Sequence, residues 1–227
     1  MSMLQREAAP LRTQLVARLR EDIIEGHYAA GDRLIEKNLE ATYGVSRTVV
    51  REALRQLESE QLVEIVPNVG PKVRGLTYED VVNLYQVRAA LESAACRLAA
   101  ESASGERVEA LRQAYEHLRT HATQDSIADL IGEKNKFYDA LIEASGNPII
   151  GEMLANVQAR IAQLRFITLT APDRVPHMLA ELRKVVEAIE AADPSAADVA
   201  SQTHVDCATQ IALRHIAHLR STEGNIK

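Results

Sequence analysis

An amphipathic segment at residues 46–59, SRTVVREALRQLES, carries a row of arginines. At helical spacing its apolar side chains share one face: Val50, Ala53, Leu54 and Leu57. Three arginines recur at four-residue intervals beside that face: Arg47, Arg51 and Arg55. Ser46 can cap the helix, because a serine hydroxyl accepts a backbone N–H of the first turn. The segment predicts a helix with one buried side and one basic, exposed side.

Two helices are predicted before this segment and two short strands after it. The run at 11–24 has helical apolar spacing, and a shorter helix is expected from about Glu36 to Tyr43, ended by Gly44. The β-prone runs LVEIV and KVRG follow, joined by the turn-rich stretch PNVGP. Pro71 restricts the second strand to a sheet edge. This order of elements is that of a winged helix-turn-helix.

The rest of the chain predicts helices alone. About six are expected, separated near residues 104–106, 122–125, 145–148, 170–174 and 193–196, where Gly, Pro and Asp interrupt the pattern. The expected fold is therefore mainly α, with an N-terminal winged helix-turn-helix at 1–76 and a C-terminal all-α helical bundle at 77–227.

The distribution of charge matters more than its total. The chain of 227 residues has a net charge of −6, and residues 1–76 hold eleven basic and eleven acidic residues. DNA binding would therefore depend on where the arginines lie rather than on a general positive charge. No stretch approaches the ~20 apolar residues of a membrane span, and the N-terminus lacks the pattern of a secretion signal. We expect a cytoplasmic protein, with Cys96 and Cys207 as reduced core thiols.

An exposed arginine row suits DNA, because guanidinium groups bind phosphates and guanine edges. A row of three arginines is also compatible with an ordinary solvated helix face. The Gly-Val-Ser turn before the helix, the short helix preceding it and the hairpin after it favour the DNA interpretation.

The run RLIEKNLEATYGVSRTVVREALRQLESEQLVEIVPNVG resembles the DNA-binding domain of the GntR family of bacterial regulators, over residues 11–75. The resemblance implies DNA contacts by Lys37, Ser46, Arg47, Thr48 and Arg51, and a wing tip at Asn68 and Gly70 that enters the minor groove. The sequence departs from the family pattern at Val49, Gln61 and Val69. Of these departures, Val69 predicts weaker wing binding or an altered sequence preference.

Within 77–227, three polar side chains interrupt apolar helical stripes: Arg88, Lys134 and His204. A buried Arg or Lys is costly unless an anion neutralises it. For each residue alone, an internal salt bridge or a side chain reaching the surface is the simpler explanation. Three of them in one bundle favour a polar cavity for an anionic ligand.

The runs VVNLYQVRAALESAACRLAA, FYDALIEASGNP and LRKVVEAIEAAD resemble the FCD domain of the FadR/FCD subfamily, over residues 78–221. The resemblance implies an all-helical, dimeric domain that binds small organic acids. Many such domains hold a metal with one Asp and three His residues. Here those positions fall on Lys134, Tyr138, Leu182 and His204. We therefore expect no metal and no cofactor. Lys134 would replace the charge of the metal, and Arg88, Tyr138 and His204 would hydrogen-bond the carboxylate of the effector.

The sequence thus predicts a ligand-responsive transcriptional regulator, with repression as the expected mode. It would act as a homodimer on double-stranded operator DNA with an inverted repeat, would sense a small organic acid and would have no membrane partner. The alternatives are a metal-dependent helical-bundle enzyme, for which we find no Glu-x-x-His repeats, and a winged-helix protein-interaction module. We expect His117 and His121 to be surface histidines. Periodicity does not decide whether Arg160 or Arg165 faces the cavity.

Overall fold

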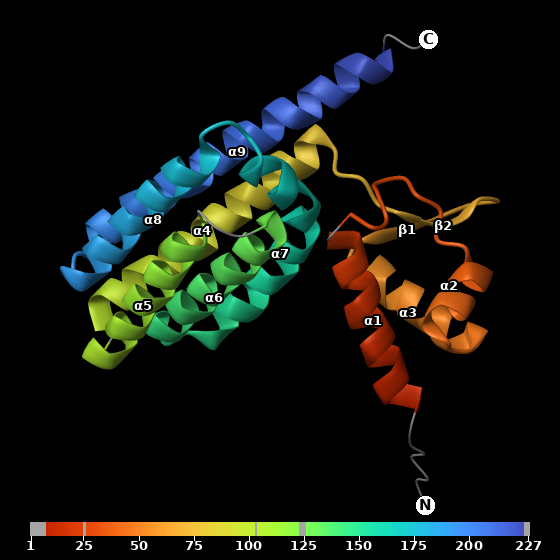
Figure 1. Cartoon of the computed structure of the whole chain (residues 1–227), viewed down its shortest axis with the longest axis horizontal. Coiled ribbons are helices and arrows are strands. Elements are labelled where there is room, and N and C mark those ends of the chain that lie inside the picture. Colours follow the sequence, from red (N-terminus) through yellow and green to blue (C-terminus); the bar gives the residue numbers. More distant parts are fainter. Residues whose placement is uncertain (1–7, 25, 103, 123–125, 225–227) are drawn as a thin grey trace, which may run out of the picture. The chain divides into compact units, whose positions relative to one another are not determined.

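The computed structural model describes residues 8–24, 26–102, 104–122 and 126–224, and the chain divides into two compact units between Leu76 and Thr77 (Figure 1). The first unit contains α1 (Ala8–Ile24), α2 (Glu36–Tyr43), α3 (Arg47–Ser59), β1 (Val63–Val66) and β2 (Gly70–Val73). The second contains α4 (Tyr78–Ser102), α5 (Gly105–His121), α6 (Ile127–Ser145), α7 (Pro148–Leu169), α8 (Arg174–Glu190) and α9 (Pro194–Gly224). The predicted fold class is confirmed.

The first unit is held together by apolar faces of its three helices. α1 packs against α3, and α2 packs against α3. The buried side chains include Leu19 and Ile23 of α1, Leu39 of α2, and Val50 and Leu57 of α3. Polar links fix the helix ends, because Arg20 forms a bidentate ion pair with Glu60 and the Tyr43 hydroxyl donates to the buried carboxylate of Asp22.

Helix α3 has a capping motif at each end. The Ser46 hydroxyl accepts the backbone N–H of Val49 at 3.5 Å, which is the expected N-cap. At the other end, the backbone N–H of Gln61 donates to the carbonyl of Glu58, and the backbone N–H of Leu62 donates to the carbonyl of Leu57. This is a Schellman motif, in which the residue at the Gln61 position adopts the left-handed conformation and glycine is preferred. Gln61 has a φ of 61°, so a glutamine occupies a site that favours glycine.

The two strands form an antiparallel hairpin in which Val66 pairs with Gly70 and Val63 with Val73. Asn68 and Gly70 have positive φ angles of 63° and 99°, so the tip uses two residue types that tolerate this conformation. β2 is an edge strand of this two-stranded sheet, as expected, although its other side also makes backbone contacts. Arg33 forms a bridge with Lys72 on the other side of β2, and Leu34 N–H donates to the Pro71 carbonyl. Pro71 is tolerated because only its carbonyl is needed there.

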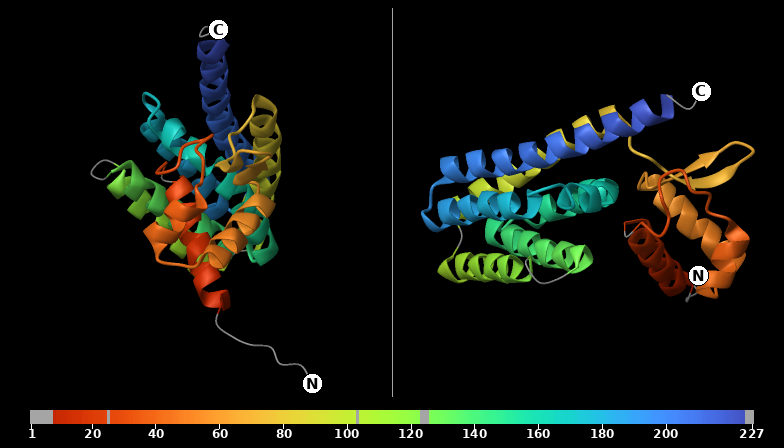
Figure 2. Two further views of the ribbon diagram at one scale, coloured as in Figure 1. Left: turned by 90° about the vertical axis from the view of Figure 1, so that its right-hand side faces the viewer. Right: turned by 45° about the horizontal axis from the view of Figure 1, so that its top comes forward.

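The second unit is a bundle in which α4 packs against α9 and α6, α5 against α6, and α8 against α9 (Figures 1 and 2). Its core is aliphatic and alanine-rich, with Phe137 as its largest fully buried side chain. Helix ends coincide with the predicted breaks. Ser104 caps α5, Ser126 and Asp129 form a capping box at α6, and Gly146 ends α6 in the left-handed conformation. This packing places polar side chains of α4, α6, α8 and α9 together inside the bundle.

Candidate nucleic-acid interface and effector pocket

The outer face of α3 is basic and accessible. Arg47, Thr48, Arg51 and Arg55 are exposed, whereas Val50, Ala53, Leu54 and Leu57 are buried. Glu52, between these arginines, is only half-exposed. The face that presents arginines is therefore opposite the face that packs into the first unit, as DNA reading requires.

A carboxylate of α2 positions two of these arginines. Glu36 accepts from Nε of Arg47 at 2.7 Å and from Nε of Arg51 at 2.9 Å. Hydrogen bonds from Arg51 keep the pKa of Glu36 below its ordinary value despite some desolvation, and Arg47 adds to the effect. Each of these contacts uses Nε, which is one of the three nitrogens of a guanidinium group. Glu36 thus restricts the arginine rotamers without using all of their donors.

The other residues predicted to contact DNA also belong to the first unit, and they differ in exposure and in their own contacts. Lys37 is exposed on the first turn of α2. The Ser46 hydroxyl is already engaged as the α3 cap, although the residue itself is exposed. Asn68 is exposed at the hairpin tip, and Gly70 begins β2. The wing tip bears no cationic side chain between Val66 and Gly70, because Val69 stands there.

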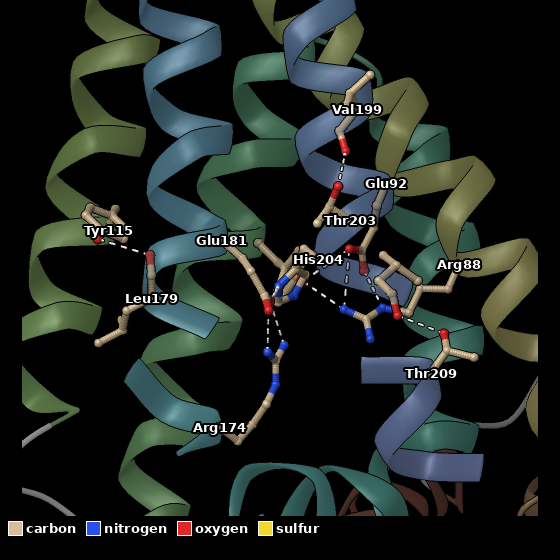
Figure 3. A network of polar contacts seen from close by, with 12 residues as sticks. Arg88, Glu92, Tyr115, Arg174, Leu179, Glu181, Val199, Thr203, His204 and Thr209 are labelled. Atoms are coloured by element: carbon tan, nitrogen blue, oxygen red, sulfur yellow. Dashed lines mark hydrogen bonds and ion pairs between the residues drawn. The ribbon is translucent and has the colours of Figure 1, made fainter. Parts of the chain in front are cut away.

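Inside the second unit, Arg88 and Glu92 form a buried ion pair on α4 (Figure 3). Nε of Arg88 lies 2.6 Å from Oε1 of Glu92, and their side chains are 6% and 2% exposed. Nη2 of Arg88 also donates to the Tyr138 hydroxyl of α6 at 2.8 Å. Burial disfavours the charged form of each side chain, but the attraction between the two charges outweighs this effect. The pKa of Arg88 is raised by the neighbouring Glu92, and that of Glu92 is lowered by Arg88.

His204 of α9 joins this pair to a second one. Its Nε2 lies 3.1 Å from the Tyr138 hydroxyl, and its Nδ1 lies 2.7 Å from Oε2 of Glu181 on α8. Glu181 also accepts two hydrogen bonds from Arg174, at 2.6 and 2.8 Å (Figure 3). Burial lowers the pKa of His204 to about 4, although the Glu181 hydrogen bond opposes the shift. The ring is therefore neutral near pH 7, with Nδ1–H donating to Glu181 and Nε2 accepting from Tyr138.

A cavity of about 20 Å³ lies beside this network. Four cations line it: Arg88, Lys134, Arg165 and Arg174. Arg88 and Arg174 have carboxylate partners, as described above. Nζ of Lys134 lies 5.8 Å from the Tyr138 ring centre, and Arg165 donates only to the neutral amides of Asn135 and Gln158. Among the described residues, Lys134 and Arg165 thus line the cavity without a carboxylate partner.

Burial and neighbouring positive charges lower the pKa values of both Lys134 and Arg165. Burial lowers the pKa of Lys134 well below its ordinary value, and the charges of Arg88 and Arg165 lower it further. Burial also lowers the pKa of Arg165, with Arg88 contributing. An anion placed between them would reverse these effects, because an opposite charge favours the ionised form.

Sequence reasoning found part of this arrangement. Arg88, Tyr138 and His204 contact one another directly, and Lys134 lies beside Tyr138. Leu182, on which the family's second histidine position falls, is in the apolar core, and the neighbouring Glu181 is the residue that meets His204. The lining also resolves the choice on α7: Arg165 faces the cavity, whereas Arg160 pairs with Asp80.

Three charged members of the network were missed: Glu92, Arg174 and Glu181. Glu92 lies one helical turn after Arg88, and this i,i+4 spacing was a usable signal. For Arg88, the internal salt bridge was thus the correct alternative. Arg174 and Glu181 lie seven residues apart, and only the packing of α8 against α9 brings Glu181 to His204. No local pattern identifies them.

The residues at the family's metal position do not fit a divalent cation. Both nitrogens of His204 are engaged, one with Glu181 and one with Tyr138. Lys134 brings an ammonium group to the position where the family has an Asp ligand, and Leu182 offers no ligand atom. Transition metals need several nitrogen, sulfur or carboxylate ligands in one shell. This donor set instead suits an organic anion.

A larger surface depression of about 640 Å³ lies between α8 and α9. Its charged lining is mainly acidic, with Glu181, Glu187 and Asp193 against Lys184. An anion would be repelled there. The cavity beside Tyr138 is therefore the better candidate for an acidic ligand.

Comparisons with known proteins agree with both units. The sequence profile described as "Bacterial regulatory proteins, gntR family" matches residues 11–73, and that of the FCD domain matches residues 83–206. A winged helix-turn-helix with an exposed basic helix, followed by such a helical unit, defines a ligand-responsive, DNA-binding transcriptional regulator. The chain belongs to the GntR family of bacterial regulatory proteins and carries an FCD domain.

Relatives with names of this class cover nearly the whole chain. It is 28% identical over 215 residues to the HTH-type transcriptional regulator YdhC of Bacillus subtilis, covering 92% of each chain. It is 29% identical over 200 residues to the "Probable D-xylose utilization operon transcriptional repressor" of Paenarthrobacter nicotinovorans, covering 86% of this chain and 87% of the relative.

Solved structures show the same fold. A GntR regulator from Rhodococcus sp. RHA1 superposes with a TM-score of 0.74 at 25% identity, covering 88% of this chain and 96% of the other. E. coli McbR/YncC superposes with a TM-score of 0.71 at 24% identity, covering 94% of this chain and 98% of the other. Along the described residues, none of the helices combines the length and apolarity that crossing a membrane requires.

Proposed function

We propose that this regulator is a homodimeric repressor that releases operator DNA when a small organic acid, best a dicarboxylate, occupies the cavity beside Tyr138. The observation that carries the proposal is the pair of cations, Lys134 and Arg165, that line this cavity without a carboxylate partner among the described residues. Two such charges match a ligand with two carboxylates.

Each cavity residue has an assignable role. Lys134 and Arg165 neutralise the ligand, with Lys134 as a point charge and Arg165 as a two-pronged donor. Arg88 would donate to the ligand while its Nε stays paired with Glu92, and Tyr138, whose single O–H is donated to His204, would hold Arg88 in place by accepting from Nη2. His204 orients Tyr138 rather than acting as a metal ligand, because its ring is held between Tyr138 and Glu181. Because the polar side chains of this network are hydrogen-bonded to one another, we assign no catalytic role to the second unit.

The size of the cavity links binding to a change of shape. A volume of about 20 Å³ accommodates about one water molecule. A dicarboxylate therefore has to displace a wall, and α7 supplies Gln158, Arg165 and Thr168 to that wall. A ligand that binds only the displaced arrangement shifts the population toward it. This is the step by which the effector would act on DNA affinity.

The DNA side of the proposal depends on α3 and the hairpin. Arg47, Thr48 and Arg51 would contact the major groove with Lys37 on nearby phosphates, and the Ser46 region would offer the N-terminus of α3. Asn68 and Gly70 would reach the minor groove. Two copies related by a two-fold axis would read an inverted repeat in the cytoplasm, where the operator DNA lies. Repression is supported by the names of relatives, including the HTH-type transcriptional repressor RspR of Escherichia coli.

A neutral sugar is the alternative effector, since one relative is named for D-xylose utilization. D-xylose carries no charge and would leave Lys134 and Arg165 unneutralised in the cavity. The charges of this chain therefore favour an acid. A ligand panel that includes D-xylose, acetate and several dicarboxylates separates these classes.

The test is thermal unfolding of the full chain with that panel, followed by calorimetry on the best ligand. A ligand at 100 times its Kd stabilises the folded protein by about 2.7 kcal/mol. Lys134→Met and Arg165→Met should each weaken a dicarboxylate at least tenfold, whereas Lys184→Met, on the exposed face of α8, should not. Failure of every acid to raise the melting temperature, or unchanged affinity in Lys134→Met, would overturn the proposal.

A further inference from the structure

A second group of ligand-type side chains lies outside the network around His204. His117 and His121 are one helical turn apart on α5, and Glu133 comes from α6. One ligand atom of each residue can be chosen so that all three lie within 4.8 Å of one another. The two imidazole rings are nearly parallel, with 10° between their planes and 6.1 Å between their centres. Three donors thus converge from two helices.

The hydrogen bond of the His121 ring favours the tautomer that metal binding needs. Its Nδ1 lies 2.8 Å from the backbone carbonyl of His117, and a carbonyl can only accept, so Nδ1–H is the donor. In the neutral ring the lone pair is then on Nε2. Metal-binding histidines commonly donate their other ring N–H to a carbonyl or carboxylate, which fixes the tautomer and the orientation of the ring. His121 has this arrangement before any ion is present.

The third side chain is an ionised carboxylate held near the histidines. Glu133 is only 13% exposed, and Lys136 donates to its Oε1 at 2.7 Å. This hydrogen bond lowers the pKa of Glu133, and the two histidines contribute in the same direction. Oε2 is not part of the Lys136 contact, and the Lys136 side chain is 70% exposed and can move into solvent. The carboxylate can therefore turn to a cation between α5 and α6.

We propose that His117, His121 and Glu133 form a surface site for a divalent transition metal of the zinc type. Two imidazole nitrogens and one carboxylate oxygen, with water in the fourth position, are a ligand set that Zn²⁺ accepts in tetrahedral geometry. Such a set also disfavours Mg²⁺ and Ca²⁺, which prefer oxygen ligands. The ion would join the C-terminal turn of α5 to α6. The site is separate from the cavity of the proposed effector and does not depend on that proposal.

From the sequence we expected His117 and His121 to be surface histidines, because no Glu or Cys accompanies them in a supporting pattern on their own helix. Glu133 is on the next helix, so no spacing within α5 reveals it. His117 is exposed and His121 is half-buried, which gives a hydrated ion access to both rings. A pair of histidines alone would not carry the proposal. The carboxylate from α6 and the oriented ring of His121 do.

The test is calorimetric titration of the full, tag-free, chelator-treated protein with Zn²⁺, and with Mg²⁺ as the comparison ion. We expect one Zn²⁺ per chain and no Mg²⁺ binding. His121→Ala and Glu133→Gln should each weaken Zn²⁺ at least tenfold, as loss of a ligand requires. His177→Ala is the matched control, because His177 is an exposed histidine on α8, and it should bind as the parent protein does.

A spectroscopic measurement separates binding at this site from binding elsewhere. Co²⁺ in place of Zn²⁺ should give the strong visible absorption of a tetrahedral ion, and this absorption should disappear in the double variant His117→Ala/His121→Ala. Circular dichroism confirms that the variants keep their helices. Zn²⁺ affinity that is the same in the parent and in the double variant, or no Zn²⁺ binding by the parent at micromolar concentration, would overturn the assignment.

Discussion

Replacing Glu92 by glutamine tests the energetics of the buried network most sharply. Glutamine keeps the shape of the side chain but removes the charge that neutralises Arg88. The two charged groups are 2.6 Å apart at their closest atoms and almost fully buried. Breaking a buried pair from one side costs about 3–5 kcal/mol, because the remaining charge is left uncompensated. We expect the Glu92→Gln protein to lose stability in that range.

The assay is urea unfolding of the full chain at pH 7 and fixed protein concentration, followed by far-UV circular dichroism. With a urea dependence of about 2 kcal/mol per molar, the loss should lower the midpoint of unfolding by about 1.5–2.5 M. The control is the double variant Arg88→Met/Glu92→Leu, which removes both charges and keeps apolar volume. It should recover most of the loss, because replacing a whole buried pair is often close to neutral.

Two results would refute this reasoning. A Glu92→Gln protein within about 1 kcal/mol of the parent would show that the Arg88 charge is compensated by other groups. A double variant as unstable as the single one would show that side-chain shape, not charge, sets the cost. The double variant should also bind the effector more weakly, since Arg88 lines the cavity.

Three further changes have defined outcomes. Gln61→Gly should stabilise the protein by about 1 kcal/mol. Relief of the left-handed non-glycine conformation gains of order 1–3 kcal/mol, and the greater freedom of glycine in the unfolded chain offsets about 0.4–1 kcal/mol of that gain. Chemical denaturation measures the change, and a loss of stability would contradict the expectation. The folded protein should lose about 2–3 kcal/mol between pH 6.5 and pH 4.5, because His204 has a folded pKa of about 4 against about 6.5 when unfolded, so the unfolded chain binds the extra proton. A His204→Gln variant should lack this loss, and an equal loss in both proteins would exclude His204 as its source; Glu181, with a pKa of about 2, loses its contribution only below pH 4.5. Glu36→Ala should raise affinity for random duplex DNA and lower the ratio of specific to random binding, since Arg51 loses its orienting carboxylate; anisotropy titrations at two salt concentrations measure both, and an unchanged ratio counts against the positioning role.

The first unit was predictable because its determinants are local. Each determinant affects only the residues next to it along the chain. These determinants are the apolar spacing of α3, the cap at Ser46 and the turn residues at Asn68 and Gly70. The Glu36 contact with Arg47 and Arg51 could not be predicted in this way. It depends on the angle at which α2 packs against α3, and the periodicity of the sequence does not predict that angle.

The effector cavity was only partly predictable for the same reason. Arg88 and His204 were found because polar residues interrupt apolar stripes, which is a local signal. Arg165 could not be separated from Arg160, because α7 is apolar over much of its surface and both arginines interrupt it. Glu181 lies one residue before Leu182, the position to which the family's second histidine was transferred, and it was not singled out. One residue is about 100° of helix rotation, which moves a side chain from the core to the network.

DNA reading by α3 is tested by selecting bound sequences from a random duplex pool and titrating the selected duplex by anisotropy. We expect a short inverted repeat, a loss of about 1–3 kcal/mol in binding for Arg51→Ala, no loss for Arg112→Ala on α5, and release of the duplex by the dicarboxylate that stabilises the protein. Enrichment of no sequence, or equal binding by the parent and Arg51→Ala proteins, would contradict DNA reading by α3.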